Sequence, residues 1–227
     1  MSLLTTPLPQ PAPYPVAIPA GSVQLVGELD LPTQHGGLVI FAHGSGASRR
    51  SSRHQFVARA LRRLGFGTLL FDLLTQEEEC LDSVTGTIPF DIELLAERLL
   101  AASRWVSRQP ATKHRKIGFF GASTGGAAAL VAAANRDSAV SAVVVHGARP
   151  DLAGDHLPKV ASPTLLILGD SDELMLALNR DAYTRLTCPK QMVIIPEATN
   201  QFSEPGKLEE MTAHSSQWFN LYLGNNR

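Results

Sequence analysis

The chain has 227 residues, of which 44% are hydrophobic and 18% are charged, a composition typical of a folded globular protein rather than a disordered one. Twenty Lys and Arg residues face 21 Asp and Glu residues, so no basic excess is present that would favour nucleic-acid binding. At about 150 residues per domain, the length predicts one domain rather than two.

Two cysteines, Cys80 and Cys188, are too few for a disulfide framework, and neither belongs to a zinc-binding Cys/His pattern. We therefore expect no metal site. The apolar runs are far shorter than the roughly 18 residues that a membrane helix requires. The first charged side chain is Glu28, so the basic region of a signal peptide is missing at the N-terminus. A cytoplasmic protein that binds neither membrane nor nucleic acid is the expectation.

Prolines alternate through the first 15 residues and predict an extended arm over residues 1–15, followed by a single domain over residues 16–227. Within the domain, short apolar runs alternate with segments of helical periodicity. Strands are expected at 23–31, 37–42, 67–72, 116–120, 140–145, 163–168 and 191–195, and helices at 56–64, 92–106, 124–135, 174–186 and 207–223. This order predicts an α/β fold, with a mostly parallel sheet, helices on both faces and a site at the carboxyl ends of the strands.

A Gly-x-Ser-x-Gly motif, Gly121-Ala-Ser-Thr-Gly-Gly126, lies between an expected strand and an expected helix. Small residues on both sides of the serine allow a sharp turn that raises its hydroxyl above the sheet. The helix N-terminus then directs the backbone N–H of Thr124 at the same point. This context predicts that Ser123 is a nucleophile on such an elbow rather than a surface serine.

Another small-residue turn, His43-Gly-Ser-Gly46, follows an earlier buried strand. Backbone N–H groups in such a turn can stabilise a negatively charged carbonyl oxygen. We therefore take the N–H groups of Ser45 and Thr124 as the candidate oxyanion hole. His43 is expected to line the cleft and shape this loop rather than to act as a base.

A catalytic serine requires a histidine base and an acid that orients it. Gly169-Asp-Ser-Asp172 follows the strand at 163–168 and supplies two acids. Asp172 is the preferred one because it lies a short turn beyond the strand, whereas Asp170 suits a turn or a helix cap.

The order of Ser123, Asp172 and the loop after the last strand is that of the α/β-hydrolases. The segments HGSGASRRSSRHQFVARAL, FDLLTQEEE, GFFGASTGGAAALVAAA and EPGKLEEM resemble the dienelactone-hydrolase-like branch of that superfamily, over about residues 16–223. The resemblance implies a serine hydrolase (esterase type) acting on small esters or lactones without a cofactor, with a homodimer left open. Dienelactone hydrolases themselves use a cysteine nucleophile, so the serine at position 123 does not imply that specific activity.

The sequence departs from this family in the loop that carries the general base. Relatives resemble P-x-A-[ST]-H-L-F-x-E-P-G, whereas this chain reads Pro196-Glu-Ala-Thr-Asn-Gln-Phe-Ser-Glu-Pro-Gly206. Asn200 stands at the histidine position, and an amide cannot accept the serine proton and return it. Gln201 also replaces an apolar residue. Weak activity or none is therefore expected.

Three explanations remain open: a naturally slow or inactive enzyme, a deliberate mutation, or another histidine as the base. The second departure, at Gln201, favours natural divergence or redesign, because a deliberate knockout normally changes one residue. His146 ends a strand on the correct side of the sheet and is the candidate replacement. His214 is expected to be a surface or packing residue of the last helix.

Glu78 belongs to an acidic run after the strand at 67–72, and either it points into the cleft or the run is a solvated loop. Two functions follow from these residues: a slow hydrolase whose base at position 200 has been lost, and a non-catalytic protein that holds a small ligand in the former active site. A fold by itself does not decide between them.

Overall fold

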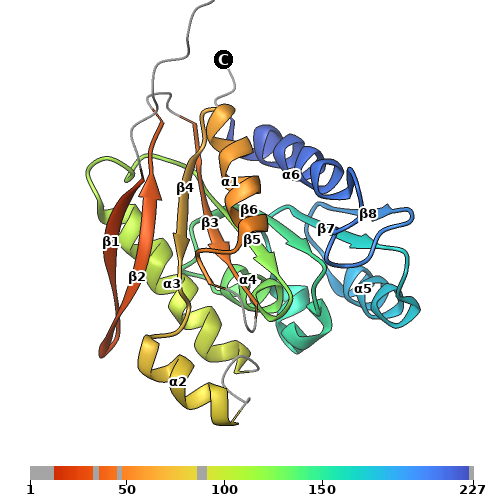
Figure 1. Ribbon diagram of the computed structural model, residues 1–227, viewed down its shortest axis with the longest axis horizontal. Helices are drawn as coiled ribbons and strands as arrows, with labels where there is room; N and C mark the ends of the chain where they lie inside the picture. The colour runs from red at the N-terminus through yellow and green to blue at the C-terminus, as the bar shows by residue number, and fades with distance from the viewer. Residues whose placement is uncertain (1–12, 33–35, 45–47, 86–90, 225–227) are drawn as a thin grey trace, which may run out of the picture.

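The structure, a computed structural model, describes residues 13–32, 36–44, 48–85 and 91–224. Its centre is an eight-stranded sheet in the order β1-β2-β4-β3-β5-β6-β7-β8 (Figure 1). β2 runs antiparallel to both β1 and β4, and every neighbouring pair from β4 to β8 is parallel, which confirms the expected α/β class. The strands are β1 (Tyr14–Ala20), β2 (Val23–Asp30), β3 (Leu38–Ala42), β4 (Gly67–Phe71), β5 (Ile117–Ala122), β6 (Val140–His146), β7 (Thr164–Gly169) and β8 (Lys190–Ile195).

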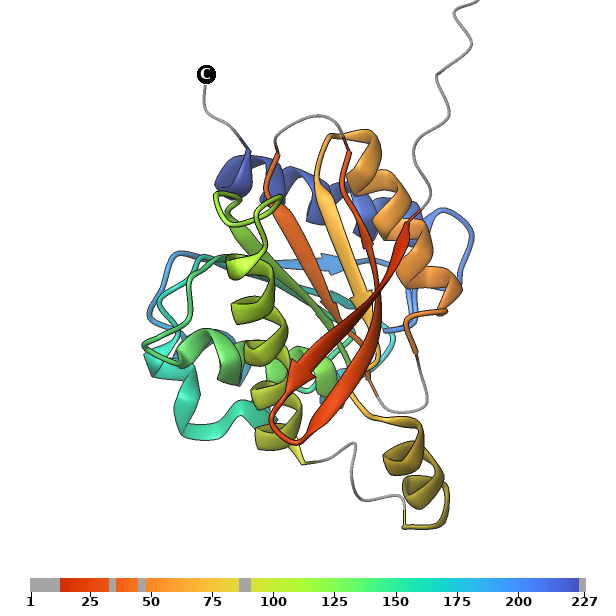
Figure 2. The ribbon, with the colours of Figure 1, turned by 90° about the vertical axis from the view of Figure 1, so that its left-hand side faces the viewer.

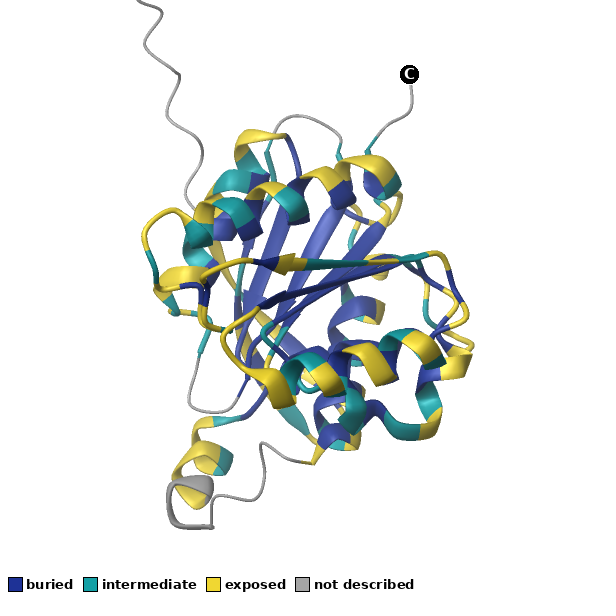
Figure 3. Ribbon diagram, turned by 90° about the vertical axis from the view of Figure 1, so that its right-hand side faces the viewer, coloured by how far each residue is buried: buried dark blue, intermediate teal, exposed yellow. Residues whose placement is uncertain are grey.

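Helices cover both faces of this sheet, so its central strands are buried (Figure 3). The helices α1 (Ser52–Arg63) and α6 (Lys207–Leu223) pack on one face. The opposite face carries α3 (Ile92–Arg108), α4 (Thr124–Ala134), α5 (Glu173–Arg185) and the 3₁₀ segment η2 (Pro150–Lys159). Two apolar cores result, one on each side of the sheet.

Strand β5 shows how the sequence produces two cores. Phe119 packs with the α3 and α4 side, whereas its neighbour Phe120 packs with the α1 and α6 side. Successive strand side chains point to opposite faces, so a strand that is buried on both sides must be apolar at every position.

The N-terminal strand was not expected, and it begins inside the segment assigned to an extended arm. Pro15 and Pro19 lie in β1, at the edge of the sheet, and pair with Glu28 and Gln24 of β2 (Figure 2). Edge strands tolerate proline because the missing N–H would face away from the neighbouring strand. Alternating prolines are therefore compatible with a strand at this position. Tyr14 and Pro15, the last residues of the expected arm, belong to β1, and residues 1–12 of that arm lie outside the described residues.

A further difference concerns the acidic run, which we expected in a loop. It forms the first turn of α2 (Gln76–Thr85), a short helix that projects from the carboxyl side of β4 (Figure 2). Acidic side chains near a helix N-terminus are favoured by the helix dipole. Within the described ranges, no helix combines the length and apolar character needed to cross a membrane.

Candidate active site

Ser123 occupies the sharp turn between β5 and α4, as the motif predicts. Its backbone has φ 51° and ψ −127°, a conformation that non-glycine residues seldom adopt, and its side chain is exposed. A Cβ at Gly121 would lie 2.7 Å from the carbonyl oxygen of Gly125, and a Cβ at Gly125 would overlap the carbonyl oxygens of Ala42 and His43. These close approaches explain why glycine is needed on both sides of the serine.

The turn after β3 lies directly against this serine. A Cβ at Gly44 would overlap Ser123 Cβ and lie 2.9 Å from Ser123 Oγ, so only glycine fits beside the nucleophile. Thr124 is the first residue of α4, and its N–H belongs to the helix N-terminus, where no intrahelical acceptor exists. Ser45, the other expected oxyanion donor, lies outside the described residues.

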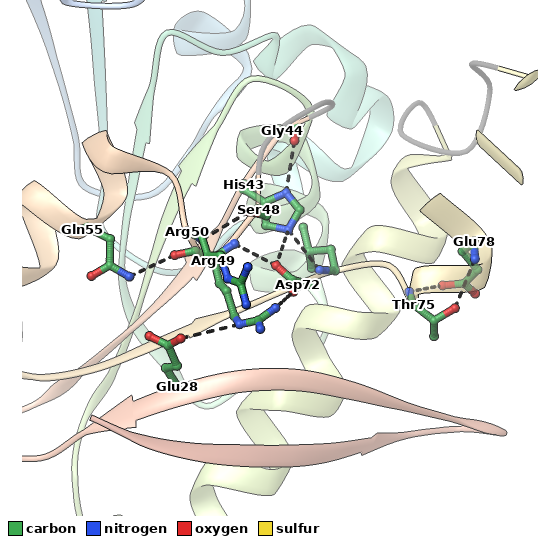
Figure 4. A network of polar contacts seen from close by, with 11 residues as sticks. Glu28, His43, Gly44, Ser48, Arg49, Arg50, Gln55, Asp72, Thr75 and Glu78 are labelled. Atoms are coloured by element: carbon green, nitrogen blue, oxygen red, sulfur yellow. Dashed lines mark hydrogen bonds and ion pairs between the residues drawn. The ribbon is translucent and has the colours of Figure 1, made fainter. Parts of the chain in front are cut away.

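His43 is buried at the end of β3 and is held in one orientation. Its Nε2 accepts a hydrogen bond from the Leu73 N–H at 3.1 Å, so the ring proton lies on Nδ1, which is 3.1 Å from the Gly44 carbonyl oxygen (Figure 4). Burial lowers the pKa of His43, outweighing the Gly44 carbonyl and the Asp72 carboxylate, which raise it. These bonds match the expected role in shaping the loop.

Asn200 lies over the ends of β6 and β7. Its Oδ1 accepts a hydrogen bond from the Gly169 N–H at 3.2 Å. Its backbone carbonyl packs so closely on Gly147 that a Cβ there would overlap it. Because β6 is the sheet neighbour of β5, which carries Ser123, position 200 lies on the same edge as the nucleophile.

Asp172 follows β7 and caps helix α5, where its Oδ1 accepts a hydrogen bond from the Met175 N–H at 3.0 Å. The cap role that the sequence suggested for Asp170 thus belongs to Asp172. Both aspartates are exposed, and among the described residues neither forms a hydrogen bond with Asn200. Asp172 remains the preferred acid only as a prediction.

The base loop, residues 196–203, has an unusual backbone. Glu197 and Phe202 each have φ 52°, and together with Ser123 they are the non-glycine residues of positive φ in the described part of the chain. Such strain concentrates at functional sites. Gln201, the second departure from the family, accepts a hydrogen bond from Arg53 of α1 at 2.9 Å.

His146, at the end of β6, is buried and packs against the base loop. It is buried against Phe120, with ring centroids 4.6 Å apart, and against Phe202 at 5.9 Å. Neither ring nitrogen has a hydrogen-bond partner among the described residues. Burial lowers its pKa to about 3, with smaller contributions from His54 and Arg53, and burial likewise lowers the pKa of His54 to about 4. Such a low pKa does not favour His146 as a base near neutral pH, and its role as a replacement base stays a prediction.

Glu78 lines a recess of about 950 Å³ between β2, the turn after β3 and the start of α2. Its carboxylate is already engaged: it accepts the Thr75 N–H at 2.8 Å and pairs with Arg98 at 2.7 Å. The described residues contain no group of three His, Cys, Asp or Glu side chains placed to hold a metal ion.

The sequence interpretation missed Asp72, which ends β4 next to the serine-side loop (Figure 4). It binds Arg49, the first residue of the basic turn that follows β3. A lone acid directly after a fully buried strand, Gly67–Phe71, was the available signal.

Comparison with known proteins identifies the family. A model of the dienelactone hydrolase family matches residues 25–219. The chain belongs to this family. The crystal structure of a dienelactone hydrolase from Anabaena variabilis is 51% identical, with a TM-score of 0.92 over 94% of this chain and 99% of that chain. Est1E from Butyrivibrio proteoclasticus, at 16% identity, has a TM-score of 0.72 over 89% of this chain and 96% of its own, which shows the α/β-hydrolase fold alone.

Two curated relatives from Mycobacterium tuberculosis strains, each named "Putative phosphoribosyl transferase", are 48% identical over 204 residues. The match covers 90% of this chain but 45% of each relative, so the chain spans less than half of their length. The dienelactone hydrolase family match therefore describes the part that is shared.

Proposed function

We propose that this chain is a serine hydrolase of small esters or lactones that acts through an acyl-enzyme on Ser123 and turns over slowly because Asn200 replaces the base. In the first step, Ser123 Oγ bonds to the substrate carbonyl carbon while its proton passes to solvent, and the leaving alkoxide departs. Water then attacks the acyl group and restores the serine. We expect this reaction to take place in the cytoplasm.

The conformation of Ser123 is the observation that carries this proposal. Strain of this kind costs roughly 1–3 kcal/mol and persists where the surroundings impose it. Here Gly44, Gly121 and Gly125 leave space for that turn alone. A surface serine without a role would not require three crowded glycines around it.

Asn200 accounts for the slow turnover. General-base catalysis typically contributes about 10²–10⁴-fold, and an amide cannot cycle a proton near neutral pH. The amide is instead bonded to the Gly169 N–H. The same observation supports the second candidate, a protein that binds a small acyl or carboxylate ligand at this cleft without converting it.

A nitrophenyl ester separates the two candidates, because its leaving group departs without protonation. We expect mass spectrometry to detect one acyl group on Ser123 and none after Ser123→Ala. Asn200→His should raise turnover by at least about 10²-fold. If the Arg53 contact with Gln201 holds the loop away from the serine, Asn200→His with Gln201→Leu should succeed where the single change fails. Absence of acylation in all of these chains would favour the binding protein.

The phosphoribosyl transferase name belongs to the whole of the longer relatives. We propose no such activity for this chain, because the residues that it shares with them are those of the hydrolase family.

A further inference from the structure

We propose that Asp72 is a positioning residue that holds the described ends of the oxyanion loop, residues 43–44 and 48–50, beside Ser123. This inference rests on the proposed hydrolase function and names the group that organises its oxyanion hole.

Asp72 holds both the backbone and the side chain of one loop residue. The carboxylate is buried at the end of β4, where the Asp72 N–H bonds to the Val26 carbonyl at 3.0 Å. Its Oδ1 accepts the Arg49 backbone N–H at 2.7 Å, and its Oδ2 accepts the Arg49 guanidinium (Figure 4). Two bonds to one carboxylate fix both the position and the direction of the chain at Arg49.

The other end of the loop is attached to the same place. His43 Nε2 accepts the N–H of Leu73, the residue after Asp72, and lies 4.0 Å from Asp72 Oδ1. Both ends of the oxyanion loop are therefore anchored on the Asp72–Leu73 dipeptide. Gly44, next to the His43 anchor, is the residue packed against Ser123, so this anchor sets the distance between the loop and the nucleophile.

Charge makes this anchor stronger than a neutral one. The Arg49 side chain is 18% exposed and lies between Asp72 and Glu28, whose Oε1 is 3.7 Å from Arg49 Nε. Arg49 Nε is buried and has no hydrogen bond among the described residues. Neutralising Asp72 would leave a partly buried guanidinium underpaired, and the loop would have to shift to rehydrate it.

A second buried ion pair provides a matched control. Asp30, at the end of β2, pairs with Arg62 of α1 at 3.2 Å, and both side chains are nearly buried. This pair joins the sheet to α1 and has no contact with the oxyanion loop among the described residues. Asp72→Asn and Asp30→Asn therefore remove the same charge from similar surroundings, but only the first removes it from the loop.

The test measures two quantities separately in these two variants: the protection of the loop amides from hydrogen exchange, and the acylation of Ser123. Amide hydrogen exchange of the peptide spanning residues 43–50 is followed in the unmodified chain, and acylation by a nitrophenyl ester is followed in the Asn200→His chain. We expect Asp72→Asn to speed exchange in this peptide and to lower kcat by about 10–100-fold with KM nearly unchanged, since donors misplaced by an ångström cost about that much. Asp30→Asn should lower the urea midpoint similarly and leave loop exchange and kcat unchanged.

Equal effects of the two variants, or a loop whose exchange is unaffected by Asp72→Asn, would overturn the proposal, because Asp72 would then be an ordinary structural pair. If the unmodified chain, Asn200→His and Asn200→His with Gln201→Leu all fail to acylate, the proposed hydrolase function fails, and so does the catalytic part of this inference. The exchange result still decides by itself whether Asp72 holds the loop. Arg49→Lys, which keeps the charge but not the paired geometry, should give an intermediate kcat.

Discussion

The nucleophile half of the candidate site, around Ser123, and its base half, around Asn200, differ in how well their side chains fit the expected hydrolase pattern. Around Ser123 both the backbone and the chemical groups fit the hydrolase pattern. Around Asn200 the loop has two residues of positive φ and a close contact with Gly147, but an asparagine stands where the family resemblance leads us to expect a histidine. Gly147 contacts the Asn200 backbone, and Gly169 contacts both the backbone of Ala198 and Thr199 and the Asn200 side-chain amide. Close packing against these two glycines thus fixes much of the form of the loop.

The largest expected effect is on turnover, and it tests whether Asp172 can support a histidine that is restored at position 200. In the Asn200→His chain, Asp172→Asn should lower turnover by about 10³-fold or more, because an amide does not stabilise the imidazolium that forms. Asparagine is an equally good helix cap, so the urea midpoint should change little. Asp170→Asn is the matched control. If Asp170→Asn gives the larger loss, the choice of acid was wrong.

Adding a single methyl group at Gly44 should disturb the nucleophile half of the site. Gly44→Ala should lower acylation of Ser123 by about 10²-fold in the Asn200→His chain, since the added Cβ overlaps Ser123 and moves either the hydroxyl or the loop. Gly21→Ala is a control for general damage to stability, because no atom lies within 4 Å of the new Cβ, although φ 66° adds strain there. Unchanged acylation by Gly44→Ala would contradict the close contact on which the site is built.

The packing beneath the base half predicts a dependence of stability on pH. The pKa of His146 is about 3 in the folded chain, against 6.5 for an ordinary histidine, so between these values the unfolded chain binds more protons than the folded one. The free energy of unfolding therefore falls as the pH is lowered from about 6.5, by up to about 1.4 kcal/mol per pH unit for each such histidine. His146→Leu should reduce this slope in urea titrations between about pH 7 and pH 5. An unchanged slope would show that His146 is not buried as described.

The smallest expected effect is a change in stability, and it measures the backbone strain at Ser123. Ser123 and Gly154 have nearly the same backbone angles, φ 51° and ψ −127° against φ 50° and ψ −127°. Ser123→Gly should therefore stabilise the chain by about 1 kcal/mol while removing acylation, and Gly154→Ser should destabilise it by a similar amount. Calorimetry or urea unfolding measures both. A loss of stability in Ser123→Gly would mean that the turn is not strained.

Much of this architecture could be predicted from the sequence, because the signals are local. The buried strands, the end of α1 before Gly65 and the elbow at Ser123 each depend on a few neighbouring residues, and the structure confirms them. The departure at Asn200 is visible in a single loop. The first strand and α2 were missed because edge position and helix capping changed what prolines and acids could do there.

The order of the elements, the elbow at Ser123 and the asparagine at position 200 each depend on contiguous residues, so the sequence determines them without the fold. Contacts between side chains that are distant in the sequence cannot be predicted in this way, and the tertiary structure alone decides them. The fold pairs Asp72 with Arg49, joins Gln201 to Arg53 and packs His146 against Phe202 of the base loop. Such contacts depend on strand order and on the face to which each side chain points, and parallel strands bring together residues that lie far apart in the chain.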